Sequence, residues 1–166
     1  MTPPEPVATG FPAIHGFGHI DLTVTDGERS VRWWEQVMGF RRVHHGEKPG
    51  FKVWNVYHPS FLGIGFVEHS NRATDTFDER AVGLDHLALR VPDRAALEAW
   101  AKHFHDLGIP HSGVQEENGG PLIVFRDPDN IQLELWAYDS TLASAQQVVA
   151  AFRIAIASVG WLAWVT

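Results

Sequence analysis

Two histidines hold the same place in two copies of one sequence pattern. Residues 16–26 read GFGHIDLTVTD, and residues 83–93 read GLDHLALRVPD. After each histidine, apolar residues alternate with other types, which is the two-residue period of a β-strand. His19 and His86 therefore lie on the polar faces of two predicted strands. Two neutral imidazoles at matched positions are suited to binding a metal, if a carboxylate joins them.

The last strand predicted in the second half supplies such a carboxylate. Residues 131–136 read IQLELW, in which every second residue is apolar and is expected to face a helix. Glu134 then lies on the other face, with the histidines. A glutamate in mid-strand is costly to bury unless a cation pairs with it. His19, His86 and Glu134 are therefore the predicted ligands of a two-histidine, one-carboxylate metal site.

Other interpretations of these three residues remain open. The histidines could be ordinary cleft residues that bond to backbone carbonyls. Glu134 could pair with Arg90 or Arg126, because buried charges are found with partners. In the first half, strand parity puts Gly65 at the position that corresponds to Glu134, and glycine has no side chain to ligate a metal.

The elements around the histidines repeat as well. Asp26 and Asp93 are placed to cap the start of a helix, and Gly39 and Gly108 follow the last residue of each helical pattern. Turn residues then separate short strands. The predicted strands are 41–45, 51–57 and 62–68 in the first half, and 111–114, 122–126 and 131–136 in the second.

This order predicts an α+β fold of two tandem βαβββ modules, which form a cleft-bearing, barrel-like pair of mixed sheets. The predicted organisation is an N-terminal arm at 1–15, a first module at 16–70, a linker at 71–82, a second module at 83–138 and an apolar, helical C-terminal tail at 139–166.

The composition limits the partners. The net charge is -7, which argues against nucleic acid or an anionic membrane surface, because both need basic surface on the protein. There is no cysteine, so disulfides are excluded. The N-terminal residues lack the pattern of a signal peptide, so a cytoplasmic protein that acts on a small molecule is expected.

The C-terminal tail is almost wholly apolar, and Arg153 is the only charge in residues 148–166. Its uninterrupted apolar part is shorter than the ~20 residues that span a bilayer. We expect a helix packed on its own domain or across a homodimer, with Trp161 and Trp164 as anchors.

The chain resembles the vicinal oxygen chelate superfamily. The resemblance rests on LDHLALRVPDRAALEAW, on VFRDPDNIQLELW and on the constellation of His19, His86 and Glu134. Its members include glyoxalase I, bleomycin resistance proteins, fosfomycin resistance proteins and extradiol dioxygenases. The resemblance implies a divalent transition metal (Fe²⁺, Mn²⁺, Zn²⁺, Ni²⁺ or Co²⁺) that two vicinal oxygens of the substrate chelate. Glyoxalase I has a carboxylate in each half, and Gly65 departs from that pattern.

The resemblance implies a lyase, an isomerase or a dioxygenase, and no catalytic acid or base is assigned. Tyr57 and His69 are candidate substrate contacts, and the aromatic side chains Trp54, Phe125 and Trp136 are candidate pocket walls or core residues. The alternative is a metal-free protein that sequesters a small molecule, as bleomycin resistance proteins do.

If the tail supports a homodimer, light scattering should give the full chain the mass of a dimer and a chain that ends at Tyr138 the mass of a monomer. An unchanged dimer would rule out this role of the tail.

Overall fold

Two units follow one another along the chain, divided between residues 76 and 77, and each is described by itself. The computed structural model describes residues 17–71, 76–117 and 119–137. The predicted arm at 1–15 and tail at 139–166 lie outside these residues. Over the described part of the chain, no helix is both long and apolar enough to cross a membrane.

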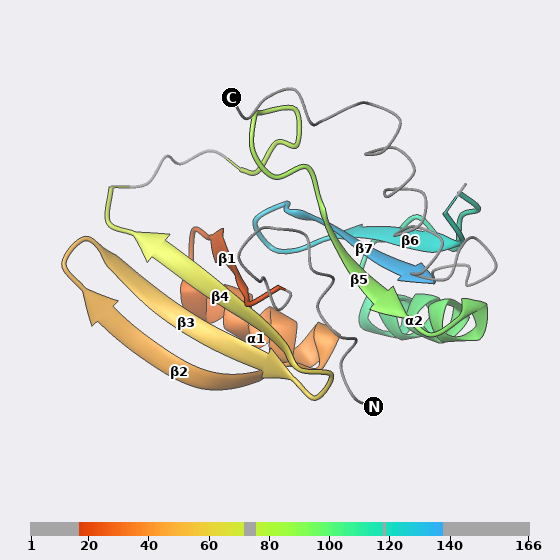
Figure 1. Ribbon diagram of the computed structural model, residues 1–166, viewed down its shortest axis with the longest axis horizontal. Helices are drawn as coiled ribbons and strands as arrows, with labels where there is room; N and C mark the ends of the chain where they lie inside the picture. Colours follow the sequence, from red (N-terminus) through yellow and green to blue (C-terminus); the bar gives the residue numbers. More distant parts are fainter. Residues whose placement is uncertain (1–16, 72–75, 118, 138–166) are drawn as a thin grey trace, which may run out of the picture. The chain divides into compact units, whose positions relative to one another are not determined.

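The first unit is a four-stranded mixed sheet with one helix against one face (Figure 1). Its elements are β1 (Ile20–Thr23), α1 (Gly27–Met38), β2 (Arg41–Lys48), β3 (Phe51–His58) and β4 (Leu62–His69). The strand order is β1-β4-β3-β2, with β1 parallel to β4 and the other neighbours antiparallel. The predicted βαβββ order of the first half is confirmed, and β2 continues beyond the predicted end.

Helix α1 begins and ends where the sequence predicts. The Asp26 carboxylate accepts the N–H of Arg29 at 2.9 Å, and Gly39 ends the helix with a φ of 73° in the left-handed region. The Glu68 carboxylate accepts the N–H of Gly27 at 3.1 Å, which ties the end of β4 to the helix start. The largest fully buried side chains of this unit are Trp34, Phe40 and Phe66.

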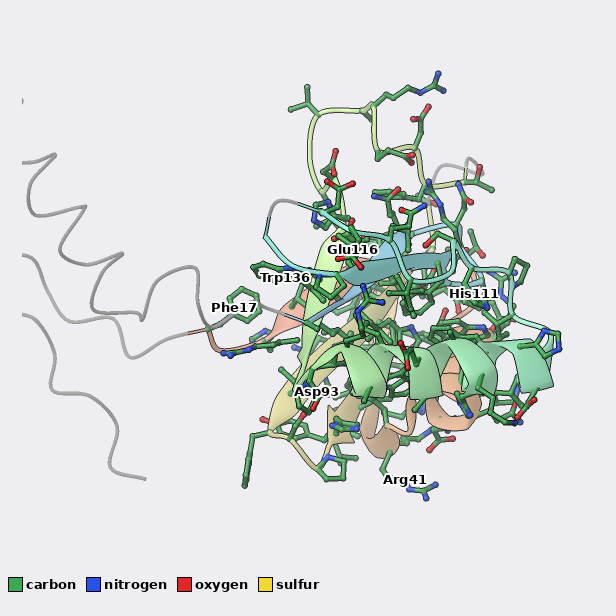
Figure 2. The ribbon with its side chains drawn as sticks, turned by 90° about the vertical axis from the view of Figure 1, so that its right-hand side faces the viewer. Phe17, Arg41, Asp93, His111, Glu116 and Trp136 are labelled. Atoms are coloured by element: carbon green, nitrogen blue, oxygen red, sulfur yellow. The ribbon has the colours of Figure 1, made fainter. Side chains whose placement is uncertain are left out.

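The second unit is a three-stranded mixed sheet with α2 against one face (Figure 1). Its elements are β5 (Leu87–Val91), α2 (Arg94–Leu107), β6 (Leu122–Arg126) and β7 (Gln132–Ala137). The central strand β7 runs parallel to β5 and antiparallel to β6. Asp93 stands at the start of α2, where its carboxylate accepts the N–H of Ala96 at 2.9 Å (Figure 2).

The strand predicted at 111–114 is wrong. His111, and Gln115 just beyond the predicted strand, each make an isolated bridge to β6, but the segment forms no continuous ladder. The Ser112 hydroxyl accepts the N–H of Val124 at 2.9 Å, in place of a backbone carbonyl. Gly113 has a φ of 73°, which breaks the extended backbone. A side-chain bond and one left-handed residue therefore turn this edge of the sheet into an irregular segment.

The turn between β6 and β7 sets the start of β7. One oxygen of the buried Asp127 carboxylate accepts the N–H groups of Asp129 and Ile131, at 2.9 and 2.8 Å. Asn130 has a φ of 67°, a conformation that asparagine tolerates. These bonds fix where the hairpin turns, and thereby which side chains of β7 face α2.

The end of the predicted linker is bound to the same turn. The backbone N–H of Phe77 donates to the carbonyl of Asp129, and the Asn130 side chain donates back to the carbonyl of Phe77. The Arg126 guanidinium donates to both Glu79 oxygens, at 2.7 and 2.9 Å. These hydrogen bonds lower the pKa of the Glu79 carboxyl from 4.5 to about 2.

Because folding lowers the pKa of Glu79, its pairing with Arg126 stabilises the protein above about pH 4.5, and the stabilisation is lost as the pH falls towards 2. Glu79→Gln should lower the urea midpoint modestly near neutral pH. The difference between the two midpoints should shrink as the pH falls from about 4.5 towards 2. Circular dichroism measures both. Glu98→Gln, which removes an exposed 3.9 Å pair with Arg94, is the control and should change the midpoint little. A Glu79→Gln difference that persists at pH 2 would contradict this account.

Candidate functional site

The pairing of β5 with β7 places Glu134 and His86 together. Ala88 pairs with Glu134 in the parallel register, and His86 lies immediately before β5. The neighbours of Glu134 on β7, Leu133 and Leu135, are buried towards α2. Strand parity then puts Glu134 and His86 on the face away from the helix. Nε2 of His86 is 3.5 Å from Oε2 of Glu134.

A second carboxylate determines how His86 presents its ring. Nδ1 of His86 lies 2.6 Å from Oδ1 of Asp85, within hydrogen-bond distance. An ionised carboxylate can only accept, so Nδ1 carries the hydrogen. In the neutral ring, Nε2 then holds a lone pair directed at Glu134. A carboxylate–histidine contact of this kind is the usual outer support of a metal-binding imidazole.

The contact between His86 and Glu134 brings two electron-pair donors face to face. Their 3.5 Å separation is longer than an ordinary hydrogen bond. Only 14% of the Glu134 side chain is exposed, so water screens it little. A second proton on the ring or a metal cation resolves the repulsion. Arg126 does not do so, because it donates to Glu79 and Gln132.

The donor separation suits a metal. Two ligand atoms about 2.1 Å from one metal lie roughly 3.0–3.4 Å apart for bond angles between a right angle and the tetrahedral angle. The separation of 3.5 Å in the second unit is slightly longer than this range. Imidazole nitrogen and carboxylate oxygen are also the donor types that Zn²⁺, Mn²⁺, Fe²⁺, Ni²⁺ and Co²⁺ accept. His86 and Glu134 are therefore two donors of the types that a divalent transition metal accepts.

A cavity of about 490 Å³ opens on this face of the second unit. It is lined by His86 and Glu134, by the apolar side chains of Leu122 and Val124, and by Trp136. Trp136 projects from the end of β7 (Figure 2). Glu117 also lines the cavity, whereas no lysine or arginine is among the described residues that line it. The described lining of this cavity is therefore largely apolar, with carboxylates from Glu117 and Glu134.

In the first unit, His19 lies immediately before β1 and lines a smaller cavity of about 180 Å³. Tyr57 and Asn55 line the same cavity, so the structure brings the predicted contact Tyr57 beside His19. Nε2 of His19 is 3.8 Å from Oδ2 of Asp21. The first unit therefore also contains a histidine with a neighbouring carboxylate.

The remaining predicted contacts lie elsewhere. Trp54 is buried against α1, and its indole N–H donates to Glu28 at 2.9 Å. Phe125 is buried against Phe104 of α2, with ring centres 4.6 Å apart. Both positions support the core role that the sequence also allowed. His69 is exposed at the end of β4, and its role as a substrate contact stays a prediction.

Sequence reasoning missed two carboxylates next to the histidines, Asp85 and Asp21. The first stands directly before His86, a signal that was readable but has no counterpart in the first half, where Gly18 precedes His19. The second is two residues after His19, on the same face by strand parity, and only its place over Gly65 required the pairing of β1 with β4. Within its described residues, neither unit by itself gathers three side chains suited to hold a metal.

Comparison with known families agrees with the repeat and the fold. The profile of the Glyoxalase/Bleomycin resistance protein/Dioxygenase superfamily matches residues 16–135. The chain belongs to this superfamily. The match covers both histidines and Glu134 and ends before the C-terminal tail.

Two solved structures are similar to the chain over most of their length. The glyoxylase/bleomycin resistance protein/dioxygenase domain from Frankia sp. EAN1pec is 30% identical, with a TM-score of 0.72 over 77% of this chain and 95% of that one. A Mn(II) complex of a variant of the fosfomycin resistance protein FosX from Listeria monocytogenes is 21% identical. Its TM-score is 0.59 over 77% of this chain and 94% of that one, which shows a shared fold.

A longer protein is also similar in sequence. The "Putative ring-cleaving dioxygenase MhqA" of Bacillus subtilis is 25% identical over 125 residues, which are 74% of this chain and 40% of that protein. The chain thus matches less than half the length of this relative.

The geometry around Asp85 predicts the tautomer of His86. In metal-free protein at a pH where the ring is neutral, the hydrogen should reside on Nδ1, because Asp85 accepts it. Asp85→Ala should move the population to Nε2–H, which can then donate to Glu134. Nitrogen-15 NMR of the imidazole reports both states. Asp106→Ala, which removes an exposed carboxylate of α2, should leave His86 unchanged. An Nε2–H ring in the unaltered protein would contradict the assignment.

Proposed function

We propose that this chain is a metal-dependent enzyme of the glyoxalase/dioxygenase type, with His19, His86 and Glu134 as metal ligands. Its substrate is a small molecule that chelates the metal through two vicinal oxygens. The observation that carries the proposal is the arrangement of Asp85, His86 and Glu134, in which a held imidazole presents a lone pair to a largely buried carboxylate. A divalent metal bound to both groups would relieve the repulsion between the lone pair and the carboxylate without a second proton on the ring.

Each described residue has a part in such a site. Asp85 fixes the ring of His86, and Glu134 contributes negative charge from a position with little exposure to water. Leu122, Val124 and Trp136 form an apolar wall that would exclude water from a bound substrate. When bound, a divalent metal supplies Lewis-acid stabilisation of the oxygens that chelate it.

The residues that line the larger cavity bear on the charge of the substrate. A phosphonate or phosphate is normally held by arginine or lysine. The described residues that line this cavity include neither, and they include the carboxylates Glu117 and Glu134. The lining therefore supports an uncharged substrate, with an apolar or aromatic body beside its vicinal oxygens. Tyr57, beside His19, is the candidate hydroxyl contact from the first unit.

Elemental analysis after loading with Fe²⁺, Mn²⁺, Zn²⁺, Ni²⁺ or Co²⁺ tests the proposal. The unaltered protein should bind about one metal per chain, and His86→Ala and Glu134→Ala should each lose most of it, because one donor of the pair is gone. His105→Ala, an exposed histidine of α2, is the matched control and should retain the metal. Far-UV circular dichroism verifies that each variant is folded.

A protein that takes up none of these metals would overturn the enzyme proposal. The metal-free alternative would then predict that a small apolar molecule quenches the fluorescence of Trp136, and that Trp136→Phe reduces the quenching.

A further inference from the structure

The two units place their carboxylates on different strands. In the second unit, Glu134 stands on the central strand β7, and Ala88 is its partner on β5. In the first unit the pair is reversed, because Gly65 stands on the central strand β4 and Asp21 is its partner on β1. Gly65 therefore corresponds to Glu134, and Asp21 corresponds to Ala88. Each partner pair contains one carboxylate and one small residue.

The Asp21 side chain occupies the space that a side chain at position 65 would need. A Cβ on Gly65 would overlap Oδ1 of Asp21, and it would lie 2.9 Å from Cγ of Asp21 and 3.2 Å from Nδ2 of Asn55. Gly65 is outside the set of glycines with positive φ, so its backbone does not require glycine. The carboxylate of Asp21 is what leaves no room there. It extends from the edge strand β1 over β4.

Asp21 contacts His19 through the same kinds of atom as Glu134 contacts His86, although the Asp21 side chain is 45% exposed and that of Glu134 is 14% exposed. The donor atoms are 3.8 Å apart in the first unit and 3.5 Å apart in the second, and both distances join Nε2 to a carboxylate oxygen. Within the described chain, the one ionic contact of Asp21 is with His19. No lysine or arginine among the described residues forms an ion pair with Asp21. His19 also lines a cavity, together with Asn55 and Tyr57.

We propose that Asp21 is a fourth protein ligand of the metal and supplies the carboxylate that Gly65 cannot. This inference rests on the proposed function and extends its ligand set to His19, Asp21, His86 and Glu134. With neutral imidazoles, the two carboxylates balance the charge of a divalent cation, whereas one carboxylate leaves a net positive site.

The extra ligand limits the reaction. A six-coordinate metal with four protein ligands keeps two open positions, and both are used when a substrate chelates through two oxygens. Ring cleavage at the metal needs a further position for dioxygen. The four-ligand set thus assigns the site to Lewis-acid chemistry on the chelated substrate, such as isomerisation or addition and elimination next to a metal-bound oxygen.

Titration with Mn²⁺, followed by electron paramagnetic resonance of the free ion, measures the affinity without any assay of activity. Asp21→Ala should weaken binding at least as much as loss of an outer-shell partner does, which is about 10–100-fold. Glu47→Gln, an exposed carboxylate of β2, is the matched control and should bind like the unaltered protein. Glu134→Ala reports whether the proposed metal site exists at all.

A relocated carboxylate separates a ligand role from a structural one. In the double variant Asp21→Ala, Gly65→Glu, the overlap with Asp21 is removed and a glutamate stands where the second unit has Glu134. The double variant should recover most of the affinity that Asp21→Ala loses. Gly65→Ala alone should weaken binding, because its Cβ displaces the Asp21 carboxylate.

The number of water molecules bound to the Mn²⁺ is an independent measure, and it needs only the variant Asp21→Ala. Proton relaxation should count about two waters on the metal in the unaltered protein and about three in Asp21→Ala, since a six-coordinate ion replaces each lost ligand with water. Unchanged affinity and an unchanged water count in Asp21→Ala, with binding lost in Glu134→Ala, would overturn the fourth ligand and leave the proposed function intact. Absence of binding in the unaltered protein would overturn both.

Discussion

In the second unit, the parallel register that pairs Ala88 with Glu134 determines whether a site exists. The side chains of Leu133 and Leu135 are buried beneath α2, and full burial of each contributes about 1.5–3 kcal/mol. A slip of one residue would turn both to solvent and drive Glu134 into the core. Burial of the leucines therefore holds the glutamate on the opposite face, although the leucines have no part in its chemistry. The Asp127 turn reinforces this register by fixing where β7 begins.

The two halves share a fold but not the same support for their histidines. His86 is held at Nδ1 by Asp85. In the first half, Gly18 stands at the position of Asp85 and has no side chain to hold His19. The carboxylate near His19 comes from the edge strand, on a shorter side chain, and covers a glycine on the central strand. The repeat therefore conserves the kinds of donor group and their relation to the sheet, while the strand that carries the carboxylate changes.

Membership of the superfamily fixes the architecture more firmly than the reaction. The likeness to FosX at 21% identity shows the fold alone, and the match to MhqA covers 40% of that protein. The details that bear on the reaction are local: the absence of lysine and arginine from the described lining of the larger cavity, and the carboxylate of Asp21 beside His19. Both concern side chains carried on a shared fold, and one fold can support several reactions.

The sequence by itself determined the repeat, both helices with their caps, and the face on which Glu134 and His86 lie. These follow from local rules, since strand parity and capping depend on residues close together in the chain. It failed at 111–114, where the Ser112 side chain replaces a ladder acceptor and Gly113 turns the backbone. It also read Gly65 as the loss of a carboxylate. Only the pairing of β1 with β4 brought Asp21 over that glycine, because a contact across strands depends on register, and register is set by burial in the whole unit.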